Sequence, residues 1–149
     1  MRALLRDPDP IVRYGAVLGM EGREPSARVA ALAPLLMDPV ANVRAQAAFA
    51  LADCEAQLGA EDQRAFLSAA ADYESSQRSN AERDFAWVNL GLFSARRGRI
   101  EEAVAHCRRA LLADAGSVRA AVNLADLLRE SDRDAEGEVV LRTALSHAF

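Results

Sequence analysis

Apolar residues recur at intervals of three and four along most of this chain, which places them on one face of an α-helix. Ile11, Val12, Ala16 and Met20 follow this spacing. The segment from Glu61 to Arg78 does so as well, with its apolar face formed by Phe66, Ala69, Ala70 and Tyr73. The pattern therefore predicts helices, among them segments over about residues 26–37, 40–58 and 61–78.

The pattern itself repeats, with two different periods. The residues from Arg6 to Arg13 return 31 positions later, from Met37 to Arg44. Further on the period is 34, because Asn89-Leu90-Gly91 returns as Asn123-Leu124-Ala125. Periods of this size are typical of stacked helical hairpins, each of which needs its neighbours to bury its apolar face. We therefore expect an all-α fold, a right-handed α-α superhelix (solenoid) of about nine helices.

Composition and charge narrow the classes of partner. Only 5% of the 149 residues are aromatic while 51% are apolar, so we expect closely packed helices with an Ala, Leu and Val core. The net charge of −4 is spread over the chain. Since no segment has the basic excess that a phosphate backbone requires, we do not expect nucleic-acid binding. No apolar run is long enough to predict membrane insertion.

The turns in the two copies of the 31-residue repeat contain related residues. Asp9 and Pro10 are typical of a helix start, and Asp38-Pro39 are expected to repeat this arrangement. An Arg follows the turn Asp after six positions in both copies, as Asp7 and Arg13 and as Asp38 and Arg44. We expect these residues to form an Asp/Arg ladder between stacked repeats. The alternative is that Arg13 and Arg44 bind an anion.

This Asp-Pro pattern, followed by Val-Arg and Ala, resembles HEAT repeats, including the HEAT-like repeats of bilin lyases. The resemblance covers about residues 2–58 and implies a HEAT-like region over 1–58. It departs from the family pattern at Gly15 and Gly19. Only Arg2 to Arg6 stand where the first helix of the first repeat belongs, so we expect the chain to be a piece of a longer protein with a truncated first repeat.

A junction helix is expected over 59–79, and the 34-residue period begins after it. From Ala81 onward the chain resembles tetratricopeptide repeats, which implies two such repeats over 80–149. The matching positions of the first copy are Trp87, Leu90, Gly91, Gly98, Ala103, Ala110 and Asp114, and those of the second are Leu124, Ala125, Leu141 and Ala144.

In tetratricopeptide repeats the first helix of each hairpin lines a concave groove that takes peptides. Asn89 and Asn123 are the most informative positions, because an amide can both donate to and accept from a peptide backbone. The alternative is that both simply hold helix geometry. In one subset of these repeats, a basic residue and an Asn bind the C-terminal carboxylates of chaperones. This chain has Val88 and Leu92 at those positions, so we do not expect it to bind chaperones. The groove positions that the resemblance implies are Phe85, Val88, Asn89, Leu92, Arg96, Arg119, Val122, Asn123, Asp126 and Arg129.

The sequence contains no recognisable catalytic or metal-binding motif. Glu101 and Glu102 are adjacent and so point to different sides of a helix. His106 and Cys107 do not have the spacing of a zinc site. Cys107 and Cys54 are predicted to be small buried hydrophobic residues. We therefore expect no enzyme activity, no cofactor and no metal; a HEAT-type lyase, as an alternative, would need an accessible nucleophile or base.

These patterns predict a noncatalytic scaffold for protein-protein interaction that binds a peptide or partner protein on its concave face. The order of the parts also resembles the C-terminal region of bacterial multihaem c-type cytochromes, although this chain has no Cys-x-x-Cys-His motif. That resemblance implies an accessory domain of a periplasmic redox enzyme; otherwise we expect a cytoplasmic protein. Apolar end faces are expected to allow a homodimer, through Leu4, Leu5, Val139, Val140, Leu145 and Phe149.

Overall fold

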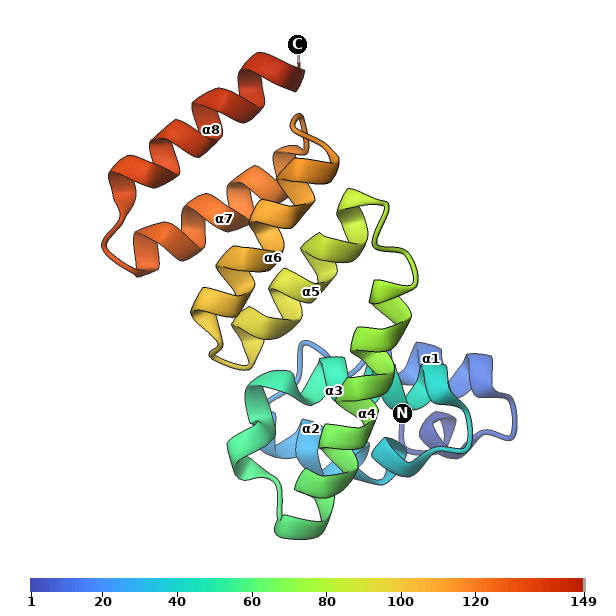
Figure 1. The fold of residues 1–149 in the computed structure, drawn as a ribbon. Coiled ribbons are helices and arrows are strands. Elements are labelled where there is room, and N and C mark those ends of the chain that lie inside the picture. The colour runs from blue at the N-terminus through green and yellow to red at the C-terminus, as the bar shows by residue number, and fades with distance from the viewer. Residues whose placement is uncertain (149) are drawn as a thin grey trace. The chain divides into compact units, whose positions relative to one another are not determined.

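The computed structural model describes residues 1–148. Over this range the regular elements are helices, namely eight α-helices and three short 3-10 helices, without a strand (Figure 1). They form two compact units, one from Met1 to Ser76 and the other from Gln77 onward. The expected all-helical repeat architecture is confirmed, with two of the expected long helices each replaced by a shorter α-helix and a 3-10 turn. Phe149, expected on an end face, lies outside the described residues.

The first α-helix of the first unit has the expected cap. Asp9 accepts a hydrogen bond from the Ile11 amide at 2.8 Å, and Pro10 is the first residue of its helix. Asp38 does not repeat this cap, because the residue that precedes the next helix is Val40; the Asp38 carboxylate accepts from the Val40 amide at 2.9 Å, as Asp7 does from the Asp9 amide. The elements are η1 (Leu4–Arg6), α1 (Pro10–Leu18), α2 (Pro25–Leu32), η2 (Ala33–Met37), α3 (Ala41–Leu51), η3 (Ala52–Gln57) and α4 (Ala60–Arg78), which ends in the second unit.

Two expected helices, over 26–37 and 40–58, are each interrupted. Pro34 lacks an amide hydrogen, so α2 cannot continue through it and the chain tightens into η2. In the second case the Ala50 carbonyl accepts a hydrogen bond from Arg28 at 2.8 Å. The chain then continues beyond Leu51 as the 3-10 helix η3.

The core of the first unit lies between α1, α2, α3 and the two 3-10 helices η2 and η3. Most of its fully buried side chains are aliphatic, as the composition predicts, although the largest is Phe66 of α4. The predicted apolar face of α4 is also confirmed, and the Tyr73 ring lies 5.3 Å from that of Phe49. The buried residues that define this core include Val17, Leu32, Leu36, Val43 and Leu51.

The second unit consists of two helical hairpins. Helix α5 (Asp84–Arg96) packs on α6 (Ile100–Ala113), α7 (Val118–Glu130) packs on α8 (Asp134–Ala148), and α7 also contacts both α5 and α6 (Figure 1). The hairpin turns hold Gly98 and Asp132, 34 positions apart, with φ angles of 73° and 57°. Since both residue types tolerate this left-handed backbone, the two turns are equivalent.

A polar contact joins the two hairpins at their starts. Ser117 precedes α7 and donates a hydrogen bond to the Asp84 carboxylate at the start of α5, at 2.7 Å.

In the described part of the chain, no helix is both long and apolar enough to cross a bilayer.

Candidate functional site

An open pocket of about 290 Å³ lies between α5 and α7, the first helices of the two hairpins. It brings together four of the predicted groove residues, namely Leu92, Arg96, Asn123 and Asp126. Their convergence follows from the repeat, because equivalent positions of stacked hairpins lie side by side. The other lining residues are Gly91, Ala95, Ile100, Cys107, Leu127 and Glu130. We call this set of ten residues the α5–α7 groove.

Asn123 differs from its repeat partner Asn89. The Asn89 amide is half-buried and donates a hydrogen bond to the Gln77 side chain at 3.0 Å. Asn123 is also half-buried, but its side chain makes no hydrogen bond with any residue in the range 1–148. The Asn123 amide is therefore available in the groove, whereas that of Asn89 is occupied.

The remaining predicted positions do not line the α5–α7 groove. Val88 was expected on the groove face but is only 2% exposed, because it packs against Ala110 and Ala120 in the core of the unit. That expectation is corrected. Arg129 is exposed and holds the Asp126 carboxylate at 3.0 Å. The others are also exposed but lie outside the groove: Phe85, Arg119 and Val122.

The lining of the groove combines apolar and charged groups. Leu92 is 44% exposed and, with Ile100 and Leu127, offers an apolar surface. Arg96 comes from α5, whereas the carboxylates of Asp126 and Glu130 come from α7. Such a surface suits an extended segment that carries apolar and charged side chains.

Gly91 and Cys107 are two buried residues of the groove lining. Helices α5 and α6 cross so closely here that a Cβ atom at Gly91 would lie 2.9 Å from the Cys107 sulfur. Burial raises the pKa of the Cys107 thiol to about 11. Cys107 and Cys54 are both fully buried free cysteines, which confirms the sequence prediction.

We expect Cys107 to react with iodoacetamide at pH 8 more than about 100-fold more slowly than glutathione, because only the thiolate is nucleophilic. Mass spectrometry of the alkylated peptides measures this rate, and the urea-unfolded protein provides the fully reactive reference. A rate close to that of glutathione in the folded protein would contradict the structure and would reopen a nucleophilic role.

A second cluster, which the sequence pattern did not reveal, joins Trp87 and His106. Their rings stack with centroids 5.8 Å apart, and the Arg109 guanidinium lies 5.1 Å from the Trp87 ring centre. The Ser94 hydroxyl lies 3.3 Å from the His106 ring. Since Ser94 and His106 are only 4% and 8% exposed, this hydroxyl and imidazole pair is closed to a substrate. It holds α5 against α6.

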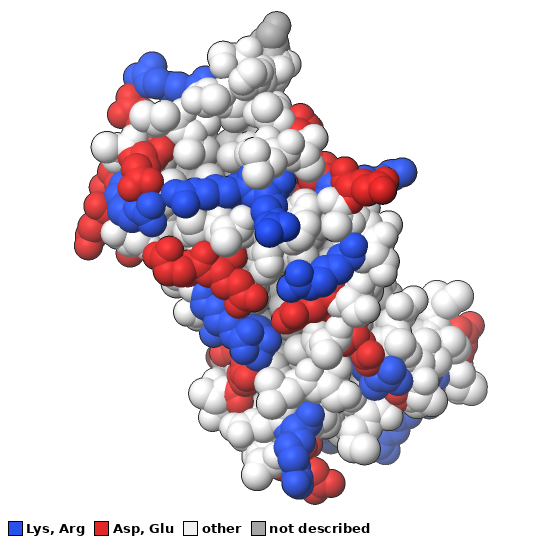
Figure 2. Space-filling view, in the orientation of Figure 1, with Lys and Arg blue, Asp and Glu red and all other residues white. Residues whose placement is uncertain are grey.

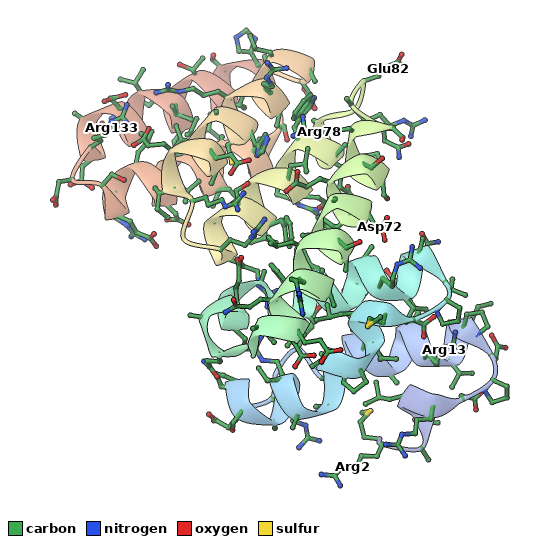
Figure 3. The ribbon with its side chains drawn as sticks, turned by 60° about the horizontal axis from the view of Figure 1, so that its bottom comes forward. Arg2, Arg13, Asp72, Arg78, Glu82 and Arg133 are labelled. Atoms are coloured by element: carbon green, nitrogen blue, oxygen red, sulfur yellow. The ribbon has the colours of Figure 1, made fainter. Side chains whose placement is uncertain are left out.

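The predicted Asp/Arg ladder is present in the first unit. The Arg13 guanidinium holds both oxygens of Asp38, at 2.7 and 2.9 Å, and its third nitrogen donates to the backbone carbonyls of Asp7 and Pro8. In the next copy Arg44 holds Asp72 at 2.8 Å; Arg13 and Asp72 are labelled in Figure 3. Every nitrogen of Arg13 is thus occupied within the protein, which favours the ladder over anion binding at this residue.

Burial of the Asp38 carboxyl would raise its pKa, but this is outweighed by the hydrogen bonds from Arg13 and the Val40 amide and by nearby positive charge. The pKa of Asp38 is therefore below its ordinary value, and the carboxylate is stable in a buried position. A third pair, Arg28 with Asp53 at 2.8 Å, was not predicted from the repeat.

Charges on the surface of the second unit are mixed. Figure 2 shows basic and acidic side chains next to each other on this unit. Arg133 holds Glu136 at 2.8 Å, and Arg108 of α6 reaches the same carboxylate of α8 at 3.5 Å. Arg133 lowers the pKa of Glu136 by hydrogen bonding and by its charge. The pair of Arg108 and Glu136 connects α6 with α8.

The end faces expected to pair two chains are only partly exposed. Leu4 is 45% exposed, but Leu5 is buried, because it packs inward as the one buried residue of η1. On α8, Val139 and Leu145 are exposed while Val140 is half-buried against the core. Among residues 1–148 no cluster of His, Cys, Asp and Glu has the arrangement of a metal site.

Comparison with known families supplies one match. The model of HEAT repeats matches residues 1–83, which is more than half of the chain and extends beyond the expected boundary at residue 58. No curated protein and no solved structure matches the sequence. The matched region includes both rungs of the Asp/Arg ladder and the whole of α4. The chain therefore belongs to the HEAT repeat family.

Proposed function

We propose that this protein is a noncatalytic scaffold that binds an extended peptide of a partner protein in the α5–α7 groove. Proteins of the HEAT repeat family commonly bind protein partners and are typically not catalysts. This family membership supports the general role. The groove itself lies beyond residue 83, outside the matched region, so its role rests on its own chemistry.

The unoccupied Asn123 amide is the observation that carries the proposal. An extended peptide presents one carbonyl and one amide per residue, and an Asn side chain can satisfy both. The apolar lining next to Asn123, from Leu92 and Leu127, would bury a side chain of the same peptide. A peptide with an apolar residue between a basic and an acidic one would match Asp126 and Glu130 on α7 and Arg96 on α5.

The second unit is proposed to be a pair of tetratricopeptide repeats. Two structural features support this: the hairpins repeat with a period of 34, and the turn residues Gly98 and Asp132 share a left-handed backbone. In that arrangement the groove between first helices is the place for a peptide.

Replacing Asn123 with alanine is expected to weaken peptide binding by about tenfold, because two hydrogen bonds to the peptide backbone are lost. The test begins with a displayed random library, from which peptides that bind the purified protein are selected. The dissociation constants of these peptides are then measured by fluorescence anisotropy. Thr143→Ala on the exposed face of α8 is the matched control and should leave binding unchanged. Equal binding by both variants would contradict the proposal.

The alternative proposal is an accessory domain of a periplasmic multihaem cytochrome whose chemistry lies elsewhere in the protein. A HEAT region followed by two further hairpins, which is the order expected from that resemblance, supports this alternative. The mass and visible spectrum of the natural protein distinguish the two, since a haem band on a longer chain would favour the accessory domain.

A further inference from the structure

The two rungs of the Asp/Arg ladder are not equivalent. Arg13 gives two nitrogens to Asp38, and the side chains of this pair are 11% and 3% exposed. Arg44 gives only its Nε to Asp72, and the exposures there are 26% and 33%. Both arginines donate Nη1 to the two backbone carbonyls of the preceding turn. The hydrogen bonds of the two arginines therefore differ at Nη2, which donates to Asp38 in Arg13 but does not donate to Asp72 in Arg44.

The Nη2 atom of Arg44 therefore makes no hydrogen bond with any residue of the described chain, whereas that of Arg13 donates to Asp38. Arg44 lines an open pocket of about 510 Å³ in the first unit. Guanidinium groups bind carboxylates most strongly when two donors face the two oxygens. The Nη2 atom of Arg44 is thus one donor without a partner on a side chain that lines this pocket.

A second basic side chain comes to the same pocket from α4. Arg64 lines it together with Ser68, one turn later, and Arg64 forms no ion pair with any residue between 1 and 148. The same pocket has an apolar side formed by Leu36, Ala65 and Met37, whose side chain is 73% exposed. Donors for an anion and a surface for an apolar group therefore lie in one pocket.

Glu61 also lines the pocket, and its negative charge repels an anion there. It is exposed and precedes Arg64 by three positions on α4, but no ion pair joins the two. Asp38 and Asp72 are already neutralised by Arg13 and Arg44. Glu61 is therefore the group whose removal should strengthen an anion site.

We propose that this pocket, which we call the Arg44 pocket, binds an acidic side chain of a partner peptide between Arg44 and Arg64, with a neighbouring apolar side chain against Met37. The site lies in the first unit and does not depend on the α5–α7 groove. It gives the scaffold a second contact, selective for acidic and apolar sequence. Two contacts on one partner would raise the overall affinity above that of either site.

The test uses two acetylated and amidated pentapeptides, one with glutamate between two leucines and one with glutamine in its place. Titration of the ¹⁵N-labelled full chain by NMR should show amide shifts at Met37, Arg44, Arg64 and Ser68. The glutamate peptide is expected to bind about tenfold more tightly than the glutamine peptide, since a charged hydrogen-bonded pair is lost in the second.

Substitutions of exposed side chains then assign the site. Arg64→Gln should weaken binding of the glutamate peptide by about fivefold, while Glu61→Gln should strengthen it by about threefold. Arg23→Gln, on an exposed arginine of the first unit outside the pocket, is the matched control and should change nothing. Thermal melting confirms that each variant is folded.

Equal affinity for the two peptides, or an Arg64→Gln variant that binds like the native chain, would overturn the proposal. Shifts confined to α5 and α7 would overturn it as well, while leaving the proposed function intact. Conversely, Asn123→Ala is expected to leave the shifts of the Arg44 pocket unchanged, so failure at one site is distinguished from failure at the other.

Discussion

Replacing Arg13 with methionine is expected to lower the free energy of unfolding of the first unit by about 3–5 kcal/mol. The substitution keeps most of the volume of the side chain but removes the guanidinium that holds both oxygens of Asp38. The Asp38 side chain is only 3% exposed, so water cannot replace the lost partner. A buried carboxylate without its counterion is among the most destabilising changes in a protein.

Arg44→Met provides the matched control, because Arg44 occupies the equivalent position in the next copy. Its partner Asp72 is 33% exposed, so water solvates the freed carboxylate and the expected loss is about 1 kcal/mol or less. Hydrogen exchange of amides in α3 reports both losses within the first unit. Equal losses for the two variants would contradict the different burial of the two rungs.

The contribution of the Arg13 and Asp38 pair to the free energy of unfolding should also depend on pH, in a defined direction. Since the pKa of Asp38 is lowered in the folded protein, the unfolded chain takes up its proton first as the pH falls. The pair therefore stabilises fully above about pH 4 and less at lower pH. In Arg13→Met the burial of Asp38 acts without the counterion and raises its pKa, so the difference in free energy of unfolding between this variant and the native chain should begin to shrink at a higher pH than the one at which the native pair weakens.

Replacing Gly91 with alanine is expected to destabilise the second unit by about 1–3 kcal/mol, although alanine favours a helix more than glycine does. The added Cβ atom would lie 2.9 Å from the Cys107 sulfur and 3.4 Å from the Ala103 carbonyl oxygen. Cys107 is completely buried, so the sulfur has little room to move and α5 must shift away from α6. Such a shift would also disturb the floor of the α5–α7 groove.

Two controls separate the steric effect from a general effect of glycine. A Cβ atom at Gly15 in α1 would meet no atom within 4 Å, so Gly15→Ala should stabilise the first unit by about 0.5–1 kcal/mol. In a Cys107→Ala background the contact is absent, so Gly91→Ala should cost much less there. Urea unfolding followed by the fluorescence of Trp87, the single tryptophan, measures the second unit. If Gly91→Ala lowers the stability of the second unit as much in the Cys107→Ala background as in the native chain, the contact with Cys107 is not the cause.

The sequence predicts the ladder because its residues keep a fixed distance from a turn. Asp38 and Arg13 both belong to the repeated pattern, and stacking of equivalent turns brings them together. Arg28 and Asp53 have no counterpart in the first copy, so the repeat contains no signal for their pairing. Arg28 also donates to the carbonyl of Ala50, next to the last residue of α3, and this contact has no signal in the repeat either.

The groove is predictable only in part for a similar reason. Leu92, Arg96, Asn123 and Asp126 line the groove, as the resemblance to tetratricopeptide repeats implies, whereas Val88 is buried against Ala110 and Ala120. Helical spacing identifies a face, but the angle at which hairpins cross decides which edge of that face remains open. The difference between Asn89 and Asn123 depends on Gln77, which lies before the first hairpin.

A crystal structure of the chain with a library-selected peptide tests the proposed scaffold role most directly. The account predicts an extended peptide between α5 and α7, with its backbone hydrogen-bonded to the Asn123 amide and an apolar side chain against Leu92. A peptide bound at another surface, with the α5–α7 groove empty, would contradict it, as would a library that yields no binding peptide at all.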